Sequence, residues 1–225
     1  MKSVSIASDG PSGAGKSTLA RKVAAALGFL YVDTGAIYRS IGYYLTREGV
    51  DLEKEDDVLS RLPSLKVELF YGEDGLQHMC VNGEDVTGKI RAPEVSVAAS
   101  VVSAYPGVRS FLLEMQRELA RTHNVIMDGR DIGTVVLPHA TVKIFLTASP
   151  EERARRRTLE LEQRGMAEPY EKVLKEIRER DYADTHRATA PLRQAEDAVV
   201  LDTSELNFEE SERALLDLIE ERTNG

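Results

Sequence analysis

The strongest constraint on this chain is an eight-residue motif near its N-terminus. Residues 10–17 are Gly-Pro-Ser-Gly-Ala-Gly-Lys-Ser, a full match to G-x-x-x-x-G-K-[ST]. An apolar run at 4–8 precedes the motif, and apolar residues at helical spacing follow it over 16–27. Glycines let such a backbone curl so that several N–H groups face phosphate oxygens, at the positive end of the following helix. The motif predicts a phosphate-binding loop between a strand and a helix.

This loop supplies the expected ATP contacts. They are Gly10, Pro11, Ser12, Gly13, Ala14, Gly15, Lys16, Ser17 and Thr18. Lys16 can reach the β- and γ-phosphates, and the Ser17 hydroxyl can bind Mg²⁺. A glycine-rich turn that only joins a strand to a helix is the alternative, but the apolar pattern on both sides favours the phosphate loop.

The rest of the chain alternates between strand-like and helix-like patterns. Short apolar runs fall at 4–8, 29–32, 124–127, 142–146 and 198–201. Helical patterns fall at 16–27, 35–47, 93–104, 108–121, 150–164, 170–184 and 208–221. This order predicts an α/β fold, a five-stranded parallel sheet with helices on both faces. Ligands should bind beyond the carboxyl ends of its strands.

We predict a single domain, 1–225. Two segments within it depart from the alternation of strands and helices. Residues 63–91 contain two alternating, β-like runs and an Asn82-Gly83 turn, which predicts a small antiparallel insertion. Residues 150–189 form a charged helical pair broken at Gly165 and Pro169, and we expect a mobile lid there. The core then comprises about 1–62, 92–149 and 190–225.

Charge and composition narrow the choice of partners. The net charge of −9 does not suit a general nucleic-acid binder. The single cysteine, Cys80, allows no intramolecular disulfide; we expect it to be buried, in a protein of the reducing cytoplasm. No apolar run is long enough to cross a bilayer. We expect a monomer, with no membrane or nucleic-acid partner.

Asp128 follows the apolar run Val125-Ile126-Met127. A carboxylate at the end of a strand helps to hold Mg²⁺ in P-loop enzymes, directly or through water. Asp128 is therefore the candidate metal residue beside Ser17, and Asp131 is a second candidate for the same role.

Arginines concentrate in residues 151–193 of this otherwise acidic chain. Phosphoryl transfer depends mostly on neutralising spread negative charge, and the planar, always charged guanidinium suits that task. The alternative is a solvated helix pair with surface ion pairs, such as Glu151 with Arg155 and Glu152 with Arg156. For the cluster as a whole we favour a lid over ATP.

Three further segments carry a family resemblance. They are Asp33-Thr34-Gly35-Ala36-Ile37-Tyr38-Arg39, Asp128-Gly129-Arg130-Asp131-Ile132-Gly133-Thr134 and Arg180-Asp181-Tyr182-Ala183-Asp184-Thr185-His186-Arg187. Together with the phosphate loop, they resemble the bacterial cytidylate kinases, which are nucleoside monophosphate kinases of the P-loop class. The likeness covers nearly the whole chain. Thr34 stands where Ser is expected, and the hydroxyl is kept.

The resemblance implies Mg²⁺-dependent transfer of a phosphoryl group from ATP to CMP or dCMP, and it implies roles for individual residues. Lys16, Arg130, Arg157 and Arg187 would be catalytic. The acceptor would be bound by Thr34, Tyr38, Arg39, Ser100, Arg109, Arg130, Asp131, Arg180, Asp184 and Arg187. Among these, Ser100, Arg109 and Asp131 would recognise the base, and Asp184 the sugar.

Other functions and plainer roles stay open from the residues alone. The phosphate loop also fits a kinase for UMP, AMP, dTMP or shikimate, or a non-catalytic nucleotide switch. A GTPase switch should carry an N-K-x-D segment, and the sequence has none. Ser100 could be a small helix residue, Arg109 a surface charge and Tyr38 a core residue.

Overall fold

A computed structural model describes residues 3–73 and 75–224 of this chain. It divides into two compact units, Met1–Tyr31 with Ala120–Gly225, and Val32–Leu119. Each unit is described by itself. The predicted subdivision into core, insertion and lid stays a prediction.

The first unit is built on a five-stranded parallel sheet flanked by helices, as predicted. Its strands are β1 (Ser5–Asp9), β2 (Leu30–Asp33), β6 (Val125–Gly129), β7 (Val142–Thr147) and β8 (Val199–Asp202), in the order β2-β6-β1-β7-β8. The last two residues of β2 belong to the second unit. The central strand β1 pairs in parallel with both β6 and β7, and its last residue, Asp9, lies opposite Gly129. The phosphate loop and the segment after β6 therefore leave the same edge of the sheet.

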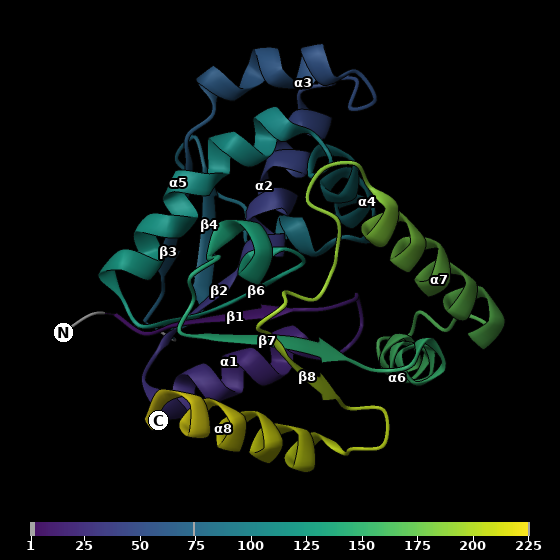
Figure 1. Cartoon of the computed structure of the whole chain (residues 1–225). Coiled ribbons are helices and arrows are strands. Elements are labelled where there is room, and N and C mark those ends of the chain that lie inside the picture. Colours follow the sequence, from purple (N-terminus) through teal and green to yellow (C-terminus); the bar gives the residue numbers. More distant parts are fainter. Residues whose placement is uncertain (1–2, 74, 225) are drawn as a thin grey trace. The chain divides into compact units, whose positions relative to one another are not determined.

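Two helices cover one face of this sheet. Helices α1 (Lys16–Leu27) and α8 (Phe208–Asn224) lie along the same face, below the strands in Figure 1. The core between them and the strands is aliphatic; its buried members include Ile6, Leu19, Val23, Ile126, Ile144, Leu146, Leu215 and Ile219. This packing fixes β1 and the start of α1, which the phosphate loop connects.

The charged segment forms two helices, α6 (Pro150–Gln163) and α7 (Tyr170–His186). Ser149 caps α6 by accepting a hydrogen bond from the Glu152 N–H at 3.2 Å. The two helices share a small apolar core of their own, made of Ala154, Val173, Leu174 and Ile177. The pair therefore packs as a subassembly within the first unit.

The second unit contains the predicted antiparallel insertion. Its sheet has three strands, β3 (Val67–Tyr71), β4 (Gln77–Val81) and β5 (Glu84–Asp85), in sequential order. The helical elements are α2 (Thr34–Arg47), α3 (Glu55–Arg61), η1 (Leu62–Ser64), η2 (Lys89–Arg91), α4 (Pro93–Val102) and α5 (Pro106–Thr122), whose last three residues belong to the first unit. No single helix among the described residues has the length and apolar composition to cross a membrane. Helices α4 and α5 reach that length and composition only when they are taken together, and they are bent by 101° relative to each other.

Most predicted elements are confirmed to within two residues at each end, and four features differ. The short helix α3 and the π-helical segment η3 (Ile132–Val136) were not predicted. Strand β5 was missed because two residues give no alternating pattern. Cys80, on β4, is partly exposed, so the expectation of a buried thiol was wrong.

Candidate active site

The phosphate loop has the backbone geometry that its glycines permit. A Cβ on Gly10 would lie 1.9 Å from the carbonyl oxygen of Leu146 on β7, so no other residue fits there. Gly13 and Gly15 have φ angles of 77° and 85°, in the left-handed region. The loop then enters α1 at Lys16. Its N–H groups and the positive end of the helix form an anion site.

Lys16 is the charged centre of this loop. Its side chain is buried, and its ammonium donates a hydrogen bond of 2.7 Å to the Pro11 carbonyl. Burial, and after it the positive charge of Arg130, lower the pKa of Lys16 to about 7, although the carboxylates of Asp128, Asp9 and Asp184 act in the opposite direction. Phosphates at this point would favour the charged form of the lysine.

Ser17 and Asp128 meet beside the loop, although they belong to α1 and β6. The Ser17 hydroxyl donates to Asp128 Oδ2 at 2.6 Å, and the Tyr31 hydroxyl donates to the same oxygen at 3.2 Å. Mg²⁺ prefers hard oxygen ligands and keeps several waters and phosphate oxygens. A hydroxyl and a carboxylate in contact, next to a phosphate loop, fit such an ion.

Two carboxylates and two guanidinium groups come together at the ends of β6 and α7. Arg130 Nε donates to Asp184 Oδ2 at 2.8 Å. Arg187 lies 3.7 Å from Asp131 Oδ1 and donates through Nε to the Ala190 carbonyl at 2.8 Å. All four side chains are largely buried. The segments that carried the resemblance, 128–134 and 180–187, thus meet in the first unit.

The arginines of α6 and α7 fall into two groups. Arg153 is buried, and it contacts the Ser12 carbonyl of the phosphate loop at 3.0 Å and the carboxylate of Asp181. Arg157 ion-pairs with Glu160 and is 40% exposed, and Arg180 is exposed. Arg153 of α6 is thus hydrogen-bonded directly to the phosphate loop.

Surface ion pairs account for several other arginines of α6 and α7. The predicted pair of Glu152 with Arg156 is confirmed. The predicted pair of Glu151 with Arg155 is wrong, because Glu151 pairs with Arg178 on α7 and Arg155 pairs with Glu152. Part of the arginine cluster is therefore a solvated helix surface.

In the second unit, Asp33 positions Arg39. Its Oδ1 accepts the N–H of Ala36 at the start of α2, and its Oδ2 accepts from Arg39 at 2.8 Å. Thr34, the first residue of the helix, is buried. One carboxylate thus caps the helix and orients a guanidinium one and a half turns later.

Tyr38, Arg109 and Ser100 form a second group in this unit. The guanidinium of Arg109 lies 5.5 Å from the ring centroid of Tyr38 and donates to the Ser103 carbonyl at 3.1 Å. The Ser103 hydroxyl in turn donates to the Ser100 carbonyl at 3.0 Å. Arg109 is buried, so the alternative of a surface charge was wrong, and Tyr38 is partly exposed rather than a core residue.

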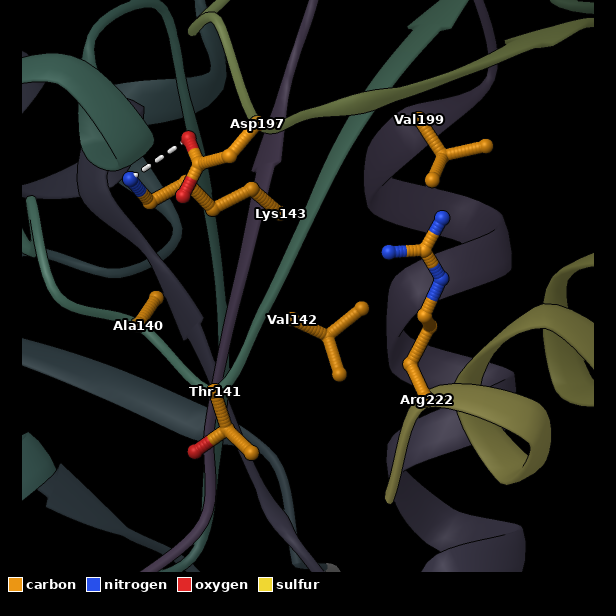
Figure 2. A pocket seen from close by; sticks show the side chains of 7 residues that line it. All are labelled: Ala140, Thr141, Val142, Lys143, Asp197, Val199 and Arg222. Carbon is orange, nitrogen blue, oxygen red and sulfur yellow. Dashed lines mark hydrogen bonds and ion pairs between the residues drawn. The ribbon is translucent and has the colours of Figure 1, made fainter. Parts of the chain in front are cut away.

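One hollow lies away from these groups. It has a volume of about 140 Å³ and is lined by residues at the amino-terminal ends of β7 and β8, including Val142 and Val199, and by Arg222 of α8. Figure 2 shows Lys143 and Asp197 joined by their 2.8 Å ion pair at one side of it. The phosphate loop follows the carboxyl end of β1, so this hollow is not part of the candidate site.

The fold and the loop define a class of protein. A five-stranded parallel sheet flanked by helices, with a complete phosphate loop after its central strand, is that of a P-loop protein, and guanidinium groups beside the loop suit a phosphotransferase. The sequence matches the profile of the family described as cytidylate kinase over residues 6–221. The chain belongs to the cytidylate kinase family, which confirms the predicted resemblance.

Individual relatives agree with this assignment. A protein of Caldicellulosiruptor bescii named cytidylate kinase is 49% identical over 97% of this chain and 96% of its own length. A cytidylate kinase of Caldanaerobacter subterraneus is 48% identical over 99% and 97%. A solved structure of an uncharacterized protein from Eubacterium ventriosum, 10% identical over 99% of both chains, has a TM-score of 0.50 and shares the fold alone.

Proposed function

We propose that this protein transfers the γ-phosphoryl group of ATP to CMP or dCMP, giving CDP or dCDP and ADP. Membership of the cytidylate kinase family over nearly the whole chain carries this conclusion. The buried, charged surroundings of Lys16 within the phosphate loop support it, because phosphoryl transfer requires neutralisation of several negative oxygens at one place.

This phosphoryl transfer requires no proton transfer assisted by the protein. An oxygen of the acceptor phosphate bonds to the γ-phosphorus, and the bond from that phosphorus to the β–γ bridging oxygen breaks. The attacking oxygen is already anionic, so no general base is required. Lys16 neutralises charge on the donor phosphates, and Arg130, Arg187 and Arg157 do so on the group in transfer.

We assign Ser17 and Asp128 to the Mg²⁺ site, with Asp128 acting through water. Their 2.6 Å hydrogen bond supports the assignment. When bound with ATP, the cation supplies charge neutralisation at the β- and γ-phosphates. The remaining loop residues, Gly10–Gly15 and Thr18, bind the phosphates through the backbone and the start of α1.

One ion pair is arranged to be exchanged for an acceptor. Asp184 holds Arg130 at 2.8 Å, and a monophosphate would compete for that guanidinium. Release of Asp184 leaves its carboxylate able to accept hydrogen bonds from the sugar hydroxyls. Arg39, Arg180 and Arg187 complete the charge around the acceptor phosphate, with Thr34 and Tyr38 beside it.

Recognition of cytosine is assigned to Asp131, Arg109 and Ser100. Cytosine presents an N4 donor and the N3 and O2 acceptors, which a carboxylate, a hydroxyl and a guanidinium can match. Uracil reverses the pattern at two positions and leaves buried polar groups mispaired. Arg109 is already fixed by Tyr38 and Ser103, which reduces the conformational freedom lost on binding.

The test is a coupled ADP-release assay with ATP, Mg²⁺ and one acceptor at a time: CMP, dCMP, UMP, AMP, dTMP or shikimate. We expect the highest kcat/KM for CMP or dCMP. A better rate with any other acceptor, or ATP binding without ADP release in the presence of CMP, would contradict the proposal. For the base contacts, Asp131→Ala should reduce the CMP/UMP ratio of kcat/KM.

Three further statements stay predictions from the sequence. They are a cytoplasmic location, a monomeric state, and the absence of nucleic-acid and membrane partners. The division into a core, an acceptor-side insertion at 63–91 and a lid at 150–189 belongs with them.

A further inference from the structure

One buried carboxylate next to the phosphate loop has no part in the mechanism above. Asp9 is the last residue of β1, directly before Gly10, and it is 4% exposed. A buried carboxylate is costly unless it is hydrogen-bonded. Asp9 lies where the phosphate loop begins, so the hydrogen-bond partners of its carboxylate indicate the role of this residue.

Both oxygens of Asp9 are used by the segment that follows β6. Oδ1 accepts the N–H of Ile132 and Oδ2 accepts the N–H of Gly133, each at 2.7 Å. These residues open the π-helical segment η3. The first N–H groups of a helical segment have no partner within it, and charge-assisted bonds to a carboxylate are stronger than neutral ones. Asp9 therefore fixes the start of η3 from another strand, 123 residues away in sequence.

The bend held in this way carries the acceptor residues. In the register of β1 and β6, Asp9 lies opposite Gly129, so strand pairing fixes the chain up to that residue. The side chain of Asp9 then fixes it again at Ile132 and Gly133. Only Arg130 and Asp131 lie between these two anchors. Their backbone positions depend on both.

We propose that Asp9 is a positioning residue for the acceptor, holding the bend that presents Arg130 and Asp131. The inference rests on the proposed function, which assigns Arg130 to the acceptor phosphate and Asp131 to the base. It extends that function by naming a residue that touches neither nucleotide. Phosphate-loop contacts with ATP depend less on Asp9, because pairing with β6 and β7 fixes the backbone of β1.

The charges around Asp9 agree with this role. Burial is the main cause that raises the pKa of Asp9 to about 6; the two N–H groups and Lys16 oppose this rise, and the nearby Asp131 adds to it. Lys143 approaches the same place with its methylene chain, while its ammonium is bound to Pro138 and Asp197. The two hydrogen bonds thus supply much of what keeps the carboxylate charged at neutral pH.

The first variant is Asp9→Asn. It keeps one accepting oxygen but turns an NH₂ group toward an N–H donor, so one anchor is lost. We expect the KM for CMP to rise on the order of tenfold or more, since small misplacements of binding groups are costly. The KM for ATP should rise much less. The CMP/UMP ratio of kcat/KM should fall, because Asp131 moves with the bend.

A second variant tests the same contact with the charge of Asp9 retained. A Cβ on Gly133 would lie 3.3 Å from Asp9 Oδ2 and 3.1 Å from Lys143 Cδ, so Gly133→Ala must displace the bend by a few tenths of an ångström. We again expect a several-fold rise in the KM for CMP and a much smaller rise in the KM for ATP. This variant keeps the inference testable if Asp9→Asn does not fold.

Asp202→Asn is the matched control. Asp202 also ends a strand of the sheet and accepts from Ser204 N at 2.9 Å and Ser204 Oγ at 2.6 Å. It should leave both KM values unchanged. Equal changes in the two KM values, or none, in both Asp9→Asn and Gly133→Ala would overturn the inference. A wild-type protein that does not phosphorylate CMP would instead contradict the proposed function.

Discussion

Arg153 and Asp181 are joined by two parallel hydrogen bonds, of 2.9 and 2.6 Å, between the guanidinium of α6 and the carboxylate of α7. The same guanidinium donates to the Ser12 carbonyl at 3.0 Å and to the Ala148 carbonyl at 2.9 Å. One side chain therefore connects α6 and α7 to the phosphate loop. Only 3% of it is exposed.

Breaking this pair should destabilise the fold. Asp181→Asn leaves a buried guanidinium without its counter-charge, which costs about 3–5 kcal/mol for a fully buried pair. Asp181 is 23% exposed, so we expect the lower end, about 3 kcal/mol. For a chain of this size that lowers the Tm by roughly 6–12 °C. Differential scanning calorimetry measures the change.

Glu179→Gln on the same helix is the control for this loss. Glu179 pairs with Lys175 at 3.8 Å, and both side chains are well exposed. Such surface pairs contribute little to stability. Equal Tm values for Asp181→Asn and Glu179→Gln would show that the Arg153 pair does not stabilise the protein.

Lys16→Met should separate stability from activity. The variant removes a buried ammonium whose pKa burial lowers to about 7, and one pKa unit equals about 1.4 kcal/mol. The unfolded lysine binds its proton up to about pH 10.4, so the folded protein gains stability as pH rises from 7 toward that value. The methionine variant should therefore have the higher Tm near pH 7, and its advantage should shrink by pH 9.

The same variant should lose most of its turnover. Loss of one group that stabilises transition-state charge reduces kcat by on the order of a hundredfold or more. Lys22→Met, on the exposed face of α1, is the comparison, since Lys22 is 53% exposed and bound to Glu212 at the surface. Near-normal turnover of Lys16→Met with ATP and CMP would exclude the proposed role of the lysine.

Local patterns predicted most of this architecture. The five strands, the phosphate loop and the long helices each depend on spacing within a short stretch of sequence, which explains why 16–27 was predicted to the residue. That Ser17 and Asp128 lie close together was also expected, because the carboxyl ends of parallel strands share one edge of a sheet.

Side-chain pairing over long separations was not predictable in this way. Glu151 has an arginine four residues on, yet it pairs with Arg178, 27 residues away, because the packing of α6 against α7 brings that residue closer. Segment η3 depends on Asp9, which no pattern near residue 132 reveals. Asp9 itself could have been noticed as an acid between an apolar strand and a glycine loop.

The Mg²⁺ requirement of two variants distinguishes whether Asp128 or Asp131 helps to bind the metal. Asp128 accepts the Ser17 hydroxyl, so Asp128→Asn should raise the free Mg²⁺ needed for half-maximal rate by roughly 10- to 100-fold. Asp131 faces Arg187 instead, and Asp131→Asn should alter the CMP/UMP ratio with little change in the Mg²⁺ requirement. Initial rates at saturating ATP and varied free Mg²⁺ decide between them. The reverse result would assign the metal to Asp131.

The contact of Tyr38 with Arg109 provides a test of the acceptor group in the second unit. The guanidinium lies 5.5 Å from the ring centroid, and this cation–π contact contributes about 0.5–2 kcal/mol. Tyr38→Leu removes the ring and frees the guanidinium, so the Kd for CMP should rise by roughly 2- to 30-fold. Tyr38→Phe keeps the ring and should retain most of the affinity. Isothermal titration with CMP in the absence of ATP measures both variants directly, and equal weakening by Leu and Phe would show that the hydroxyl, rather than the ring beneath Arg109, holds the acceptor.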